Sequence, residues 1–153
     1  MFVFTMKASG LKFLGILALS VTLLTTAIGI LPSVNAAADV AAVTTDFKNI
    51  NSEQDMVNFL LQSGYTVDQK PIEVFEMEIP EEFNSVLNSY NEIQRAQGLN
   101  LKRYLGKSAT VYVFNVTNHD HDGEVLATLF VRNGRIIAGD ICSKDGNGFV
   151  KGF

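Results

Sequence analysis

Hydrophobic and polar residues follow three successive patterns along this chain. An uncharged apolar run extends from Phe13 to Leu31. Two segments with helical spacing of apolar residues come next, and alternation typical of strands dominates from residue 108 onward. This order predicts an apolar N-terminal segment followed by an α+β domain.

Two amphipathic helices are predicted. The first begins after Ser52, a favourable N-cap, and ends before Gly64. The second extends from Pro80, which suits a first helical turn, to a stop at Gly98. Its apolar face consists of residues at helical spacing, namely Phe83, Val86, Leu87, Tyr90 and Ile93.

Alternation predicts the strands, which cover residues 72–79, 108–117, 124–132 and 135–142, with a final edge at 149–150. Asn133-Gly134 indicates a two-residue hairpin, because a type I′ turn needs two residues that tolerate positive φ. Pro71 precedes the first strand, and Glu76 and Glu78 charge one of its sides, which suits a sheet edge. We therefore expect an antiparallel meander of three to four strands packed against two main helices.

The N-terminus has the parts of a secretory signal peptide. Lys7 and Lys12 start the segment, Pro32 ends the apolar run, and Val34 and Ala36 suit the −3 and −1 positions of a cleavage site. The run of 19 residues exceeds a usual signal core and approaches the roughly 20 that span a membrane. Residues 1–36 are therefore expected to be a signal peptide or a retained N-terminal membrane anchor. Either form places the domain outside the cell or on the extracytoplasmic face of the membrane.

Composition limits the function of the remaining chain, in which residues 37–51 are expected to be a flexible tether and residues 52–153 a single domain. The whole chain has a net charge of −4, and residues 1–36 contain two lysines and no acidic residue, so residues 37–153 carry −6. An acidic domain argues against nucleic acid as a partner, and contact with a membrane is expected only through an uncleaved N-terminal segment.

A metal site is the first candidate for chemistry. His119 and His121 are the only histidines, and two imidazoles at i and i+2 of an extended segment can point the same way. With Asp122 beside them, they form the ligand types that Zn²⁺ and Cu²⁺ take. The alternative is a hydrated loop that is rich in His and Asp, which we favour because no third ligand stands out.

Other polar residues on predicted helices and strands offer weaker candidates. Tyr90, Asn91 and Gln94 form a polar and aromatic cluster on the second helix, which could line a shallow cleft or hold the following loop by hydrogen bonds. We favour the structural role. The sequence contains no recognisable catalytic constellation and no cofactor-binding motif. We therefore predict no catalytic residues and no cofactor.

The last predicted strand contains an acid and a thiol within an apolar run. Asp140 is expected to face water at a strand end, or to pair with Arg132 or Arg135, and its alternative is a buried acid with a raised pKa. Cys142 is the only cysteine, which excludes an internal disulfide. We expect it to be a small, partly buried hydrophobe rather than a reactive thiol.

Two stretches of this chain resemble a known family. They are Tyr90 to Gly106, with the sequence YNEIQRAQGLNLKRYLG, and Asn133 to Ile141, with the sequence NGRIIAGDI, followed by Gly148-Phe149. Together with the helix start at Ile79-Pro80, they resemble the bacterial domain-of-unknown-function family numbered 4830. The resemblance covers about residues 52–153 and implies a small exported or membrane-anchored protein of Gram-positive bacteria. It implies one compact α+β unit and no particular activity.

Two functions from different classes are compatible with these observations. The first is a non-enzymatic extracytoplasmic module that binds a protein, peptide or envelope component, for which a sheet edge is available. The alternative is a metal-binding protein or small metal-dependent hydrolase that uses the His119/His121 loop.

Overall fold

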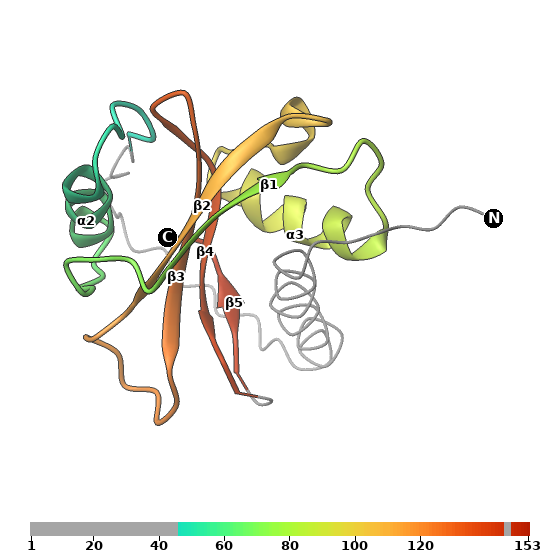
Figure 1. Cartoon of the computed structure of the whole chain (residues 1–153). Coiled ribbons are helices and arrows are strands. Elements are labelled where there is room, and N and C mark those ends of the chain that lie inside the picture. Colours follow the sequence, from blue (N-terminus) through green and yellow to red (C-terminus); the bar gives the residue numbers. More distant parts are fainter. Residues whose placement is uncertain (1–45, 146–147) are drawn as a thin grey trace, which may run out of the picture.

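The structure, a computed structural model, describes residues 46–145 and 148–153. The predicted signal peptide or anchor of residues 1–36 and most of the predicted tether lie outside these residues. The described part of the chain consists of a central sheet with helices on both sides (Figure 1). Within that part, no helix is both long and apolar enough to cross a membrane.

Eight elements follow one another along the described chain. They are α2 (Glu53–Gln62), β1 (Glu73–Glu78), α3 (Ser85–Ala96), η1 (Leu101–Tyr104), β2 (Ser108–Asn115), β3 (Val125–Arg132), β4 (Arg135–Ser143) and β5 (Val150–Lys151). The strands form one antiparallel sheet in the order β1-β2-β3-β4-β5. The α+β class is confirmed, but five strands rather than three to four are present, because both β1 and the short β5 join the meander.

Among the described residues, one α-helix covers each face of the sheet. Figure 1 shows α2 on one side of the strands and α3 on the other. Two separate clusters of buried side chains result, one between the sheet and α2 and one between the sheet and α3. The central strand β3 is buried from Val125 to Phe130 without alternation, as expected for a strand that is covered on both faces.

Helix α2 begins where the sequence predicts. The Ser52 hydroxyl accepts a hydrogen bond from the Asp55 backbone N–H at 3.2 Å, and the Asp55 carboxylate accepts one from the Ser52 N–H at 2.9 Å. This reciprocal capping box satisfies two of the donors that an open helix end leaves unpaired. Phe59 and Leu60 of this helix are buried against the sheet.

Helix α3 begins later than predicted. Its N-cap is Asn84, whose side-chain oxygen accepts the Leu87 backbone N–H at 2.9 Å, so the expected start at Pro80 is wrong. The cause is Ile79, which is fully buried and extends the pairing beyond β1. Its N–H donates to the Lys107 carbonyl at 2.9 Å, and its carbonyl accepts the Gly106 N–H at 2.8 Å. The chain is therefore still extended where Pro80 follows.

The turn between β3 and β4 has the predicted type. Asn133 and Gly134 have φ values of 50° and 68°, and the positive sign at both positions is what a type I′ turn requires. A β-bulge between Phe130 and Val131 shifts the register just before this turn. The bulge changes which residues of β4 face α3, and this matters for Asp140 below.

Residues 46–51, which fall in the predicted tether, lie against the start of β4. The Phe47 carbonyl accepts the Ile136 N–H at 2.9 Å, and the Ile50 N–H donates to the Gly134 carbonyl at 3.0 Å. Ile50 is buried, and the Phe47 ring packs on Phe59 with 5.7 Å between centroids. This segment therefore contributes to the core on the α2 side of the sheet.

Candidate functional site

The outer strand β1 presents an unusual combination of side chains. Ile72 and Val74, just before and within β1, are 49% and 51% exposed, which is high for large apolar residues. Glu73, Glu76 and Glu78 are exposed as well. We refer to residues 72–78 as the β1 edge.

Register with β2 determines where each residue of the β1 edge points. Phe75 and Met77 pair with Val111 and Ala109 and pack into the cluster beneath α3. Side chains alternate along a strand, so Val74, Glu76 and Glu78 lie on the opposite face of the sheet. No described strand lies beyond β1.

The backbone of β1 also alternates. The N–H of Ile79 donates to Lys107 on the β2 side. In an antiparallel pair, alternate residues direct both backbone polar groups to the partner strand, and the residues between them direct both groups away. By this alternation the N–H and C=O groups of Val74, Glu76 and Glu78 point outward from the sheet.

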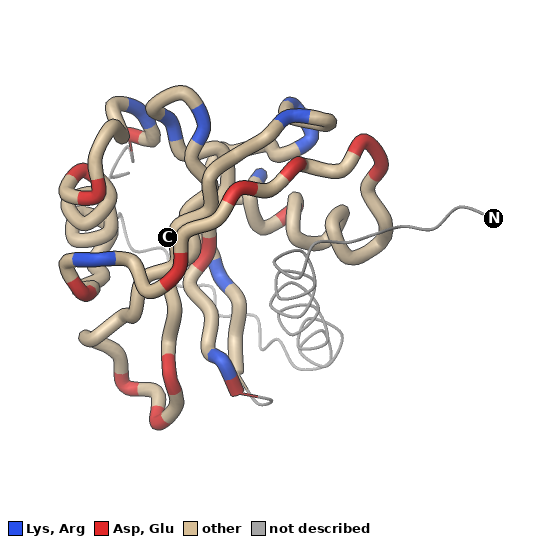
Figure 2. The backbone as a smooth tube through the Cα atoms, viewed as in Figure 1, with Lys and Arg blue, Asp and Glu red and all other residues tan. Residues whose placement is uncertain are grey.

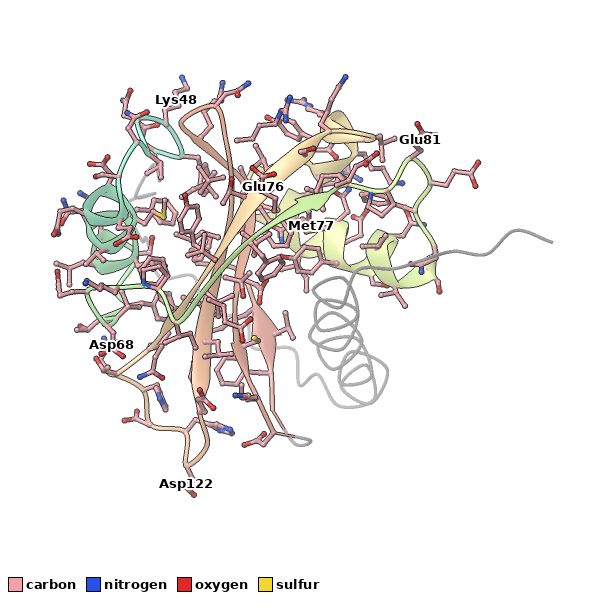
Figure 3. All side chains as sticks on the ribbon, in the orientation of Figure 1. Lys48, Asp68, Glu76, Met77, Glu81 and Asp122 are labelled. Carbon is pink, nitrogen blue, oxygen red and sulfur yellow. The ribbon has the colours of Figure 1, made fainter. Side chains whose placement is uncertain are left out.

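The glutamates of the β1 edge have no cationic partner within residues 46–145 and 148–153. The ion pairs found there are Arg95 with Glu92, His121 with Asp145, and Lys144 with Glu124. Figure 2 shows acidic positions spaced along the strand at the front of the molecule, while several basic positions gather at one end of the sheet. Figure 3 shows Glu76 and Met77 near the middle of this strand. The edge therefore combines unpaired negative charge with exposed apolar surface.

A second polar feature is buried between α3 and β4. The Tyr90 hydroxyl donates a hydrogen bond to the Asp140 carboxylate at 2.7 Å, and the two residues are 3% and 5% exposed. Burial raises the pKa of Asp140 to about 6, although the hydrogen bonds from Tyr90 and Cys142 act in the opposite direction. Burial and the neighbouring carboxylate also raise the pKa of Tyr90 well above its ordinary value.

This arrangement corrects the prediction for Asp140. The carboxylate neither faces water nor pairs with Arg132 or Arg135 but lies inside the α3 side of the molecule. Cys142, two residues further along the same face, is a free thiol, and it is buried where partial burial is expected from the sequence. Burial, with the nearby Asp140, raises the pKa of this thiol, which makes it a poor nucleophile.

The other two residues of the predicted helix cluster are also buried. Asn91 is 1% exposed, and its side-chain oxygen accepts the Leu101 N–H at 2.7 Å. Gln94 is fully buried, and its oxygen accepts the Gly139 N–H at 2.8 Å. Both side chains thus form hydrogen bonds to the backbone of other elements, Asn91 to η1 and Gln94 to β4.

Gln97 complements this arrangement and was not singled out from the sequence. Its Nε2 donates to the Gly139 carbonyl at 2.9 Å, and its oxygen accepts the Phe153 N–H at 2.9 Å. The Gln97 amide thereby bridges β4 and the chain that follows β5. Its spacing of three residues from Gln94 was the available signal, since such residues lie on one helical face.

The histidines lie in the loop between β2 and β3. His121 Nε2 lies 2.6 Å from Asp145 Oδ2, and its ring packs edge-on against Phe149. His119 Nδ1 and Asp145 Oδ1 are buried without a hydrogen-bond partner among the described atoms. Asp122 is exposed at the loop tip and points away from the molecule (Figure 3). No group of three or more potential metal ligands occurs in the part of the chain that the structure covers.

Comparison with known proteins identifies a family. No curated protein and no solved structure is significantly similar to this chain. The family described as Domain of unknown function (DUF4830) matches residues 59–141, which extend from α2 to β4 and contain the β1 edge and the Tyr90–Asp140 pair. The match covers more than half of the sequence, and the chain therefore belongs to the DUF4830 family.

Proposed function

We propose that this chain is an extracytoplasmic, non-enzymatic interaction module that binds an extended polypeptide along the β1 edge. The observation that carries the proposal is the exposure of about half of the Ile72 and Val74 side chains beside outward-facing backbone groups. The export signal predicted in residues 1–36 supports the location outside the cytoplasm.

Strand addition uses the groups that β1 offers. An extended peptide beside an edge strand gains main-chain hydrogen bonds, and its alternate side chains contact those of the edge. The outward N–H and C=O groups of Val74, Glu76 and Glu78 would supply the hydrogen bonds. The exposed surfaces of Ile72 and Val74 would supply apolar contact at roughly 25 cal/mol per Å² removed from water.

A proline at position 74 tests this mode of binding. Val74→Pro removes an outward N–H, and edge strands tolerate proline where the N–H faces solvent. Val74→Thr, the matched control, keeps the N–H and a β-branched side chain. The full chain in detergent is used to select peptides from an unbiased display library. We expect the selected peptides to bind the parent and Val74→Thr but not Val74→Pro, whereas equal binding to all three proteins would reject the proposal.

Export is tested separately from binding. The full chain is expressed in a bacterium, the domain is located by cell fractionation, and the purified product is sequenced from its N-terminus. A start at Ala37 in the extracytoplasmic fraction is the result expected for a cleaved signal, and an intact, membrane-bound chain is expected for an anchor. Recovery of the intact chain in the cytoplasm contradicts both.

Metal binding by the loop of His119 and His121 is a second candidate function, either for binding alone or for metal-dependent hydrolysis. The specific observation in its favour is that His119 Nδ1 and Asp145 Oδ1 are buried and have no hydrogen-bond partner in the part of the chain that the structure describes. Elemental analysis and thermal melts with Zn²⁺ or Cu²⁺ test it, because a ligand that binds only the folded state raises its stability. An upward shift that disappears in His119→Ala supports the candidate, and no bound metal and no shift reject it.

A further inference from the structure

We infer that the polypeptide bound by the β1 edge is basic, with lysine or arginine alternating with apolar residues along an extended segment. This inference rests on the proposed function and specifies its partner. Its basis is charge, because residues 72–82 contain five glutamates and neither lysine nor arginine.

The charge of this edge is available to a partner. Glu73, Glu76 and Glu78 are exposed and form no ion pair with any described residue. A strand added to β1 would place its side chains about 5 Å from those of β1 on the same face, a distance at which opposite charges attract and like charges repel. Positive charge on the incoming strand is therefore favoured at these positions.

The order of side chains on each face gives a more detailed expectation. Val74, Glu76 and Glu78 follow one another on the face opposite to Phe75 and Met77. The matching positions of the partner would be apolar, basic and basic. Glu73, on the other face, would attract one further cation. A partner with alternating charge and apolar character fits both faces better than a uniformly basic one.

The same charges oppose pairing with a second copy of this chain. Two β1 strands side by side would bring the glutamates of both copies into one seam. Like charges opposite one another destabilise a strand pair, and charged edges are a common means of preventing such association. A different, basic polypeptide is thus the occupant that this edge favours.

Short synthetic peptides of defined charge provide the test. One alternates valine and lysine, the second alternates valine and glutamate, and the third has the composition of the first with its lysines in one block. The full chain is titrated with each peptide in detergent. Variants are Glu76→Lys combined with Glu78→Lys, and Glu92→Lys on the exposed face of α3 as the control for charge alone.

We expect the parent to bind the valine–lysine peptide at least about tenfold more tightly than the valine–glutamate peptide. The double variant should reverse this preference, Glu92→Lys should keep it, and Val74→Pro should abolish binding of both alternating peptides. The preference should weaken as salt is added, because the charges are exposed.

The remaining outcomes separate the inference from the proposed function. Equal binding of both alternating peptides, lost in Val74→Pro, would overturn the basic partner and leave strand addition intact. Equal binding of the block and alternating lysine peptides would overturn the alternating pattern. Binding that is unaffected by Val74→Pro would overturn strand addition itself. A concentration-dependent dimer that Val74→Pro dissociates would identify a second copy as the occupant and overturn the inference.

Discussion

The two faces of the sheet are built from different chemistry. The α2 face is closed almost entirely by apolar side chains, including Leu60 and Phe114. The α3 face contains most of the buried polar side chains of the described residues, among them Gln94 and Asp140, and it has hydrogen bonds between helix and strand. Apolar packing is tolerant of small shifts, whereas hydrogen bonds to a buried group require one position of the helix. The comparison indicates that α2 is held mainly by apolar packing, whereas α3 is also positioned by hydrogen bonds to buried groups of β4.

The largest effect is expected from a cavity on the α2 face. Phe114→Ala removes a fully buried ring from this core, and we expect a loss of about 3–5 kcal/mol in the free energy of unfolding, measured by urea denaturation. Leu61→Ala is the control, because this side chain is 58% exposed and its loss should change stability by no more than about 0.5 kcal/mol. Similar values for the two variants would contradict the packing described for this face.

A pH-dependent effect is expected from the α3 face. Folding raises the pKa of Asp140 from 3.8 to about 6, so between these values the folded protein holds more protons than the unfolded chain. The contribution of Asp140 to the free energy of unfolding therefore falls as pH rises from about 4 to about 6. The total loss of stability is about 3 kcal/mol, at 1.36 kcal/mol per pKa unit. The Asp140→Asn variant should lack this pH-dependent loss of stability.

Comparing the two proteins isolates Asp140 from the other carboxylates. Denaturation of the parent and Asp140→Asn is measured across this pH range, and the difference between their unfolding free energies is plotted against pH. Asp55 remains in both proteins, so its pKa, which hydrogen bonds to Asn51 and Ser52 lower, does not affect the difference. A difference that is independent of pH would show that Asp140 is not buried as described.

A smaller effect is expected from the hydroxyl that faces this acid. Tyr90→Phe keeps the ring but removes the donor at 2.7 Å from the Asp140 carboxylate. Loss of a hydrogen bond to a buried acceptor should cost about 2 kcal/mol at neutral pH. The pKa of Asp140 should rise further, because the Tyr90 hydrogen bond lowers it. In Asp140→Asn the same Tyr90→Phe change should cost less, and an equal cost would argue against the pair.

The smallest effect concerns the local cap of α2. Ser52→Ala removes the hydroxyl that accepts the Asp55 N–H, while the backbone N–H of residue 52 can still donate to the Asp55 carboxylate. The loss should cost about 1 kcal/mol in the free energy of unfolding, measured by urea denaturation. Ser52→Asn preserves a capping oxygen and should retain most of that stability. A loss for both variants as large as that for Phe114→Ala would mean that α2 depends on polar contacts as much as α3 does.

The sequence predicts correctly those features that depend on residues close to one another in the chain. The Ser52 cap, the Asn133-Gly134 turn and the alternation of β2 depend on neighbours in sequence, and all three are confirmed. The start of α3 is predicted wrongly from Pro80, because the pairing of Ile79 with residues 106 and 107, which are distant in sequence, keeps the chain extended at that point. Location outside the cytoplasm stays a prediction.

The environment of Asp140 could not be predicted from its own segment. Its partner Tyr90 is 50 residues away in the sequence. The β-bulge after Phe130 also changes the phase of β4, so that simple alternation from Ile136 places Asp140 on the wrong face. Sequence did identify Tyr90, Asn91 and Gln94 as a cluster, because helical periodicity fixes which residues share a face. It did not identify the strand that they contact.

The connection between β1 and β2 has a consequence for the order of folding. The turn between β3 and β4 contains only residues 133–134, whereas residues 79–107, including α3 and η1, separate β1 from β2. Closing a longer loop costs more chain entropy, and contacts close in sequence form earlier. We expect β1 to join the meander last and to open first, which would appear as faster amide hydrogen exchange than in β3. A polypeptide bound beside β1 would slow that exchange, because it would hold β1 in its pairing with β2.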